Sequence, residues 1–133
     1  MKRYDFNIPI YDVDVTLLQV ERGTESECRS LRKVLRSFGC KKECIDEDIR
    51  EIRDGDMNGG ATYRNMTARV VVVVFHEFTS EERMVEVYSH EKRHVEDRIL
   101  EFFEVNDTES AGLLAGFLGV EFHKFYKMCK KEK

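Results

Sequence analysis

The pentapeptide His90-Glu91-Lys92-Arg93-His94 has the residue types and the spacing of an HExxH metal-binding motif. Residues four apart lie on one face of an α-helix, so His90 and His94 can direct two imidazole nitrogens to a single metal ion. Glu91 is then placed to accept a proton from water at that ion. The motif therefore predicts a zinc-dependent hydrolase.

The segment around the motif has the pattern of a long amphipathic helix. Ser80 is a suitable N-cap, acidic residues follow it at once, and the apolar periodicity continues to about Phe103. On a helical wheel Glu91 falls toward the apolar stripe, and His90 and His94 lie along its margin. A margin position is where ligands that face a cleft are expected. The stripe consists of Met84, Tyr88, Val95, Ile99 and Phe102.

A strand is predicted before this helix and a small-residue helix after it. The run from Ala68 to Phe78 is rich in valine, which predicts a central or well-covered strand. Asp107 or Thr108 can cap a last helix that reaches about Cys129. Small residues in its first half predict close packing against the motif helix, because glycine lowers helix stability unless backbones approach. They are Ala111, Gly112, Ala115, Gly116 and Gly119.

The first half of the chain predicts two strands and two helices. Alternation over 4–10 and 11–17 changes phase after Pro9, which indicates two short strands or one strand with a bulge. Thr24 or Ser26 can cap a helix that Gly39 ends, and a second short helix follows. The acidic, glycine-rich segment 54–60 is typical of a turn. The second helix is indicated by Ile45, Ile49 and Ile52.

The segment Glu109-Ser110-Ala111, continuing to Leu118, resembles the E-x-A segment of gluzincin zinc peptidases such as the compact cytosolic ImmA/IrrE-like enzymes. The resemblance covers about 84–122. It implies a minimal zincin-like fold, zinc as cofactor, Glu109 as third metal ligand, and peptide-bond hydrolysis with Glu91 as general base. The chain departs from the family at Lys92 and Arg93, because the inner positions of HExxH are usually uncharged.

Other residues compete for the remaining roles in such a site. Asp107, His123 and Glu121 are alternatives to Glu109 as third ligand. Glu101 and Glu104 lie on the motif helix itself, two turns or more beyond His94, which is too far to complete a tetrahedron. The oxyanion of a tetrahedral intermediate needs a further hydrogen-bond donor. The candidates for this donor are Tyr126, His123 and Tyr63.

Size and composition predict one compact domain over residues 1–133. The chain has 41% hydrophobic and 36% charged residues and a net charge of −4, which suits a soluble globular protein without affinity for nucleic acid or membranes. The N-terminal region has no continuous apolar stretch of the signal-peptide type, so we expect a cytoplasmic location. The expected class is α+β, a small and mostly antiparallel sheet packed against helices. The expected partner is a protein or peptide substrate.

Simpler interpretations stay open beside the metallopeptidase. The zincin-like scaffold could serve as a catalytically inactive binding or assembly module, or the chain could be an interaction domain without metal. Two histidines can also fall near a glutamate on a charged surface helix by coincidence. His76 is expected to be a partly buried polar residue of a strand, and Cys40 and Cys44 to be reduced, buried thiols.

Overall fold

The computed structural model describes residues 1–130. Two β-hairpins are each followed by a pair of helices, so the chain has the order β-β-α-α twice. The elements are β1 (Lys2–Ile8), β2 (Val13–Gln19), α1 (Glu25–Ser37), α2 (Lys42–Arg53), β3 (Gly60–Asn65), β4 (Val70–Phe75), α3 (Glu81–Phe102) and α4 (Thr108–Lys130).

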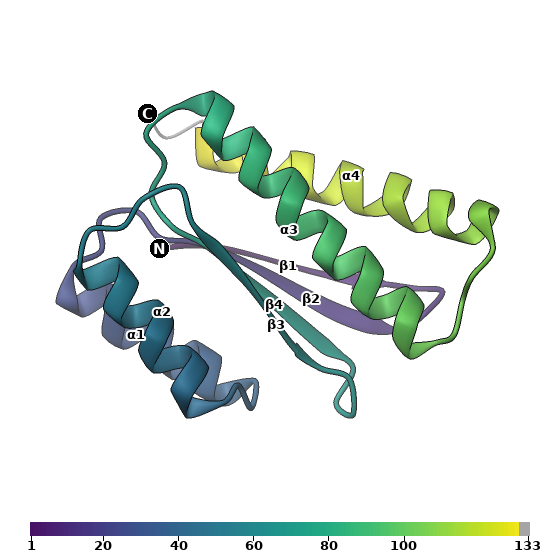
Figure 1. Cartoon of the computed structure of the whole chain (residues 1–133), viewed down its shortest axis with the longest axis horizontal. Helices are drawn as coiled ribbons and strands as arrows, with labels where there is room; N and C mark the ends of the chain where they lie inside the picture. Colours follow the sequence, from purple (N-terminus) through teal and green to yellow (C-terminus); the bar gives the residue numbers. More distant parts are fainter. Residues whose placement is uncertain (131–133) are drawn as a thin grey trace.

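The four strands form one mixed sheet in the order β1-β2-β4-β3. β1 pairs with β2 and β3 pairs with β4 in antiparallel fashion, whereas the central pair β2 and β4 is parallel. The helices α1 and α2 cover one face of the sheet, and α3 and α4 cover the other (Figure 1). The α+β class is therefore confirmed, and two of the three strand pairings are antiparallel, as expected.

The valine run forms β4, which is central and covered on both sides. Val73 and Phe75 point into the core under α3 and α4, whereas Val72 and Val74 point into the core under α1 and α2. A strand that is covered on both faces needs apolar residues at every position, which explains the unbroken run. The prediction of a central strand is confirmed, with the shorter bounds Val70–Phe75.

The edge strand β3 was not predicted from the sequence. Its residues, GATYRN, are mostly polar and half-buried. One edge of the strand pairs with β4, and the other edge has no neighbouring strand among residues 1–130. Alternate positions face opposite helix layers: Thr62 contacts Glu91 of α3, and Tyr63 contacts Asp48 of α2. This alternation gives β3 its importance for the site described below.

The predicted helix ends agree closely with the structure. The Thr24 hydroxyl accepts from the Glu27 backbone N–H, and the Ser80 hydroxyl accepts from the Arg83 N–H, so both residues are N-caps. The Ser110 backbone N–H donates to the Asp107 carboxylate at 2.8 Å at the start of α4. Gly39 follows α1 with φ of 77°, a left-handed conformation that favours glycine.

The prediction of close helix packing through the glycines of α4 is wrong. A Cβ atom added at Gly112, Gly116 or Gly119 would meet no atom within 4 Å, so these positions face open space. The exposed side chains of Leu113 and Val120 share this part of the helix. The buried residues Leu114, Leu118, Phe122 and Phe125 provide the packing of α4 instead.

None of the helices in the described part of the chain has the length and apolar character needed to cross a membrane.

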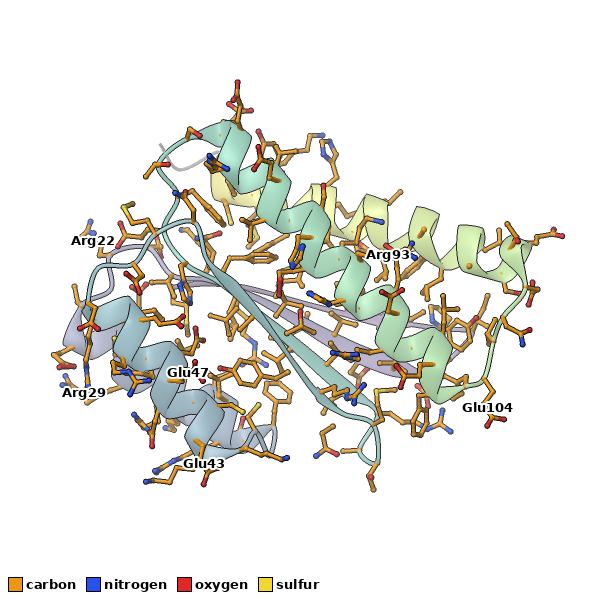
Figure 2. The ribbon with its side chains drawn as sticks, in the orientation of Figure 1. Arg22, Arg29, Glu43, Glu47, Arg93 and Glu104 are labelled. Atoms are coloured by element: carbon orange, nitrogen blue, oxygen red, sulfur yellow. The ribbon has the colours of Figure 1, made fainter. Side chains whose placement is uncertain are left out.

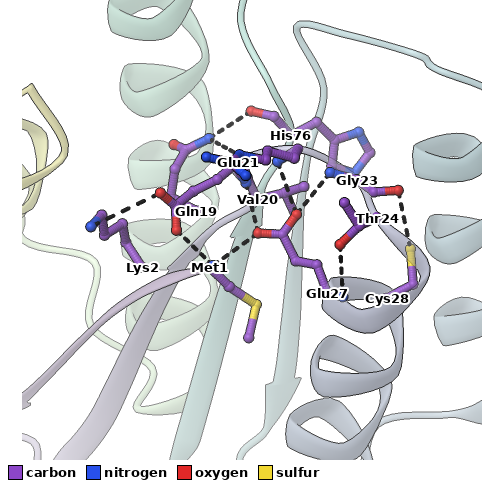
Figure 3. A network of polar contacts seen from close by, with 11 residues as sticks. Met1, Lys2, Gln19, Val20, Glu21, Gly23, Thr24, Glu27, Cys28 and His76 are labelled. Atoms are coloured by element: carbon purple, nitrogen blue, oxygen red, sulfur yellow. Dashed lines mark hydrogen bonds and ion pairs between the residues drawn. The ribbon is translucent and has the colours of Figure 1, made fainter. Parts of the chain in front are cut away.

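Glu27 at the start of α1 forms a buried polar network with the end of β2 (Figure 3). Its carboxylate accepts from the backbone N–H groups of Glu21, Arg22 and Gly23 at 2.8–3.0 Å. The α-amino group of Met1 lies 2.9 Å away. Burial opposes ionisation of this carboxylate, but the N–H donors and the α-amino group outweigh it and lower the pKa of Glu27 from 4.5 to about 2.

A pH-dependent stability contribution of Glu27 follows from this lowered pKa. The contribution is complete above pH 4.5 and is lost as the pH falls toward 2, because protonation then costs the folded state more than the unfolded state. We expect Glu27→Gln to lower the free energy of unfolding by about 2 kcal/mol at pH 7. Urea denaturation at several pH values should find this difference shrinking below pH 5.

The control for this prediction is Glu25→Gln. Glu25 forms an exposed ion pair with Arg53, so its replacement should lower the free energy of unfolding by less than about 1 kcal/mol. A Glu27→Gln effect that stays constant with pH would contradict the assignment.

Candidate metal centre

The structure brings His90, Glu91 and His94 together on α3. The Nε2 atoms of His90 and His94 lie 3.0 Å apart, and Oε2 of Glu91 lies 3.9 Å from Nε2 of His90. One ligand atom from each of the three residues lies within 4.8 Å of the others. The Glu91 side chain is 5% exposed, in agreement with its predicted place toward the apolar stripe, whereas the His90 side chain is 69% exposed, more than the predicted margin position implies.

The separation of the two imidazoles suits a shared zinc ion. With zinc–nitrogen bonds of about 2.0–2.1 Å, two ligands of a tetrahedral ion lie about 3.3 Å apart. The observed 3.0 Å between the Nε2 atoms requires only a small rotation of either ring to reach this value. The two histidines therefore fit the ligand positions that the HExxH spacing predicts.

Glu91 is held between α3 and β3. The Thr62 hydroxyl donates to Oε1 of Glu91 at 3.1 Å. Gly60 lies against the same side chain, and a Cβ atom there would come within 3.0 Å of Cγ of Glu91 and of Cγ1 of Val87. Thr62 and Gly60 were missed in the sequence because β3 was not recognised. Their spacing of two, which places both on one face of a strand, was the available signal.

The charged residues inside the motif are accommodated without burying an unpaired charge. Lys92 points toward α4. Its Nζ lies 2.6 Å from the buried carboxylate of Glu96, which is on α3 one turn beyond Lys92. Arg93 is 73% exposed on the outer surface of α3 and pairs with Asp97 (Figure 2). Arg93 therefore stays in contact with solvent, whereas Lys92 contributes to the contact between α3 and α4.

Glu109 is not brought to the two histidines. It is exposed in the first turn of α4. The flank of α3 that meets α4 carries Lys92, whose Nζ lies 3.4 Å from the carbonyl oxygen of Ala115. Successive helical residues are rotated by about 100°, so His90 and His94 lie on nearly the opposite flank from Lys92. The role of Glu109 as third ligand stays a prediction that this geometry does not support.

The other candidate residues also have partners away from the motif. Tyr126 donates its hydroxyl to Glu81 at the start of α3, more than two helical turns before His90, and exposed His123 stacks on Tyr126. Glu121 accepts from the hydroxyl of Tyr4. Asp107 caps α4. Tyr63 lies on the opposite face of the sheet, where it contacts Asp48. None of these contacts brings a third metal ligand or an oxyanion hydrogen-bond donor to the histidine pair.

A cavity lies farther along the flank of α3 that faces β3. Its volume is about 400 Å³, and it is bounded by Arg64 and Thr67 around the end of β3 and by Arg98 and Phe102 of α3. Arg98 is one helical turn beyond His94. A cavity of this size is large enough for a few side chains of a ligand.

His76 belongs to a second polar group, on the face of the sheet covered by α2. It is 2% exposed, and its Nε2 lies 2.5 Å from Oδ1 of Asp48. Burial lowers the pKa of His76, but the hydrogen bond to Asp48 and the negative charges of Asp48, Glu51 and Asp56 outweigh burial, so the pKa is raised. The prediction of a buried polar histidine is confirmed.

The cysteines lie outside both of these groups. All four are free thiols, and Cys40 is half-buried. Burial, with a smaller contribution from the neighbouring Cys44, raises the pKa of Cys40 to about 11. Neither Cys40 nor Cys44 belongs to a metal-compatible group within residues 1–130. Cys44 is exposed on α2, so the prediction that both thiols are buried is wrong for this residue.

Comparison of the chain with protein-family models, with curated proteins and with solved structures found no match. The resemblance of 84–122 to gluzincin peptidases therefore remains a hypothesis about a short segment. The conclusions that follow depend on the residues and their geometry.

Proposed function

We propose that this chain is a zincin-like metal-dependent hydrolase of peptide bonds, in which His90 and His94 hold zinc and Glu91 is the general base. The observation that carries the proposal is the pair of imidazole nitrogens 3.0 Å apart beside a carboxylate that is 4% exposed. A carboxylate is costly to bury unless its position serves a purpose or is compensated. A base next to a metal-binding pair is such a purpose.

The two oxygens of Glu91 have different surroundings, which supports its role as base. Oε1 accepts the hydrogen bond of Thr62, while Oε2 is directed toward Nε2 of His90 at 3.9 Å. Zinc bound by the histidines would supply Lewis acidity and bring the pKa of water toward neutrality. Glu91 would accept the proton of the attacking water through Oε2 and deliver it to the leaving amine. Thr62 would keep the carboxylate oriented during both transfers.

The edge strand β3 supports an extended peptide as substrate. Its outer edge has no neighbouring strand in the sheet, and Thr62 in its middle contacts the proposed base. An extended peptide can add to such an edge through backbone hydrogen bonds, which would align it beside the histidines.

A metal-binding module without turnover is the second candidate. The placement of Glu109 away from the histidines favours it, because catalytic zinc sites normally have three protein ligands. Such a module would bind zinc through His90 and His94 and would hydrolyse no peptide. Zinc content and hydrolysis must therefore be measured on the same preparations.

Replacing both histidines tests whether they form the metal centre. We expect His90→Ala/His94→Ala to bind one equivalent of zinc fewer than the parent chain and to lose peptide hydrolysis, because both imidazole ligands are gone. Elemental analysis after zinc reconstitution measures the metal, and a fluorogenic peptide library measures hydrolysis. His123→Ala removes an exposed histidine from α4 and serves as the control. A double variant with the zinc content of its parent would disprove the proposed centre.

A further inference from the structure

Three metal-compatible side chains meet on the face of the sheet opposite the HExxH motif. Asp48 and Glu51 are one turn apart on α2, and His76 directly follows β4. Nε2 of His76 lies 2.5 Å from Oδ1 of Asp48, and one ligand atom from each of the three residues lies within 4.8 Å of the others. The group therefore combines one imidazole with two carboxylates.

The negative charge of this group is only partly compensated. Asp48 is 4% exposed. Among residues 1–130, neither Asp48 nor Glu51 forms an ion pair with a lysine or arginine, and His76 is the one basic side chain in contact with Asp48. A buried carboxylate requires a compensating cation or several hydrogen-bond donors. Asp48 has hydrogen-bond partners in Tyr63 and His76, and a bound metal ion would add the positive charge that no lysine or arginine of the described residues supplies.

The second nitrogen of His76 is closed off from the carboxylates. Nδ1 is buried and has no hydrogen-bond partner among the described residues. Gly59 lies against it, since a Cβ atom at this glycine would come within 2.7 Å of Nδ1. Nε2, the other ring nitrogen, is the one that faces Asp48 and is the donor atom that His76 can offer to an ion.

We propose that Asp48, Glu51 and His76 form a second divalent-cation site, of the nitrogen and oxygen donor type that zinc accepts. Tyr63 orients Asp48, because its hydroxyl lies 3.2 Å from Oδ2, the oxygen that does not contact His76. An ion bound by Oδ1 and Nε2 would replace the present hydrogen bond between these two atoms. His76, Asp56 and Met57 border a cavity of about 180 Å³.

The position of His76 is fixed from the backbone side. The Gln19 side-chain amide donates to the His76 carbonyl oxygen at 2.8 Å (Figure 3). The His76 backbone N–H donates to the Gly59 carbonyl oxygen at 2.9 Å. A metal ion at this site would join α2 to the ends of β3 and β4, so we expect it to stabilise the fold rather than take part in hydrolysis.

The two candidate centres lie back to back across the first residues of β3. Gly59 makes room for His76 on one face, and Gly60 makes room for Glu91 on the other. Because adjacent strand residues point to opposite faces, two glycines in sequence allow both groups to approach the same short stretch of backbone. The two centres share no ligand, so their occupancies are separable by mutation.

Metal stoichiometry tests the second site independently of the proposed hydrolase. We expect zinc-reconstituted parent chain to hold two equivalents, and His90→Ala/His94→Ala and Glu51→Gln to hold one each, by elemental analysis. Cobalt(II) absorption should report the same loss, with at least about tenfold weaker binding to the altered site. Glu47→Gln, an exposed position on α2 that Figure 2 labels, is the matched control and should retain two equivalents.

Each outcome separates the two centres. Retention of one equivalent in His90→Ala/His94→Ala, with its loss on adding Glu51→Gln, supports the second site even if the HExxH centre binds nothing. A double variant that binds no zinc overturns the second site. Unchanged zinc content and affinity in both Glu51→Gln and His76→Gln also overturns it. Glu51 is only partly buried, so its variant gives a result even if His76→Gln does not fold.

Discussion

Replacing Glu91 by glutamine will reduce peptide hydrolysis about 10²–10⁴-fold and leave the bound zinc in place. Glutamine has the size of glutamate, and its amide oxygen can still accept the hydrogen bond of Thr62. It cannot accept a proton from water at neutral pH. The two histidine ligands are unchanged, so the loss should be in kcat while the zinc content matches that of the parent.

The matched control for this experiment is Glu86→Gln. Glu86 is on the same helix, is 62% exposed and forms an ion pair with Arg83. Its variant should keep both zinc and kcat. A Glu91→Gln variant as fast as the parent would eliminate Glu91 as the base. A parent chain that holds zinc at the histidines and cleaves no peptide would instead support the module without turnover.

Replacing Phe75 by alanine will lower the free energy of unfolding by about 3–5 kcal/mol. Phe75 is fully buried in the middle of the sheet, and its ring stacks on Tyr88 of α3 with centroids 4.0 Å apart. The rings of Phe122 and Phe125 of α4 pack on it from the same side. The truncation would leave a cavity where β4 packs on α3 and α4, in a protein whose total stability is about 5–15 kcal/mol.

Urea denaturation measures this effect as a lower midpoint with an unchanged m-value. Phe102→Ala is the control, because this ring is 49% exposed and its removal should cost less than about 1 kcal/mol. Similar midpoints for the two variants would show that Phe75 is not a principal contact between β4 and α3.

Local signals in the sequence were sufficient for the helices and for the buried strand. Thr24 and Ser80 form the predicted caps because a cap depends only on a side chain and the next few backbone N–H groups. The burial of Glu91 followed from helical periodicity alone, whereas His90 is more exposed than its margin position predicted. The unbroken valine run of β4 predicted a strand that is covered on both faces.

The edge strand β3 was not predicted because its sequence has neither a capping pattern nor an apolar run. Its residues are half-buried and mostly polar, and its pairing with β4 is decided by the whole sheet. The partner of the proposed base, Thr62, was missed for the same reason. The glycines of α4 were misinterpreted, since a small residue signals close approach only when another backbone is actually near.

The sequence by itself determined the two imidazoles and the carboxylate of the HExxH group, because three residues within five positions of one helix are placed by helical geometry alone. Tertiary structure decided everything that joins separate elements. The rotation of α3 about its axis directs Glu91 toward Thr62 of β3 and Lys92 toward α4, so His90 and His94 lie away from the flank that meets α4. The parallel pairing of β2 with β4 and the packing of α2 bring Asp48 to His76, 28 residues along the chain. Such contacts depend on how apolar faces fit together across the whole core, which no local pattern encodes.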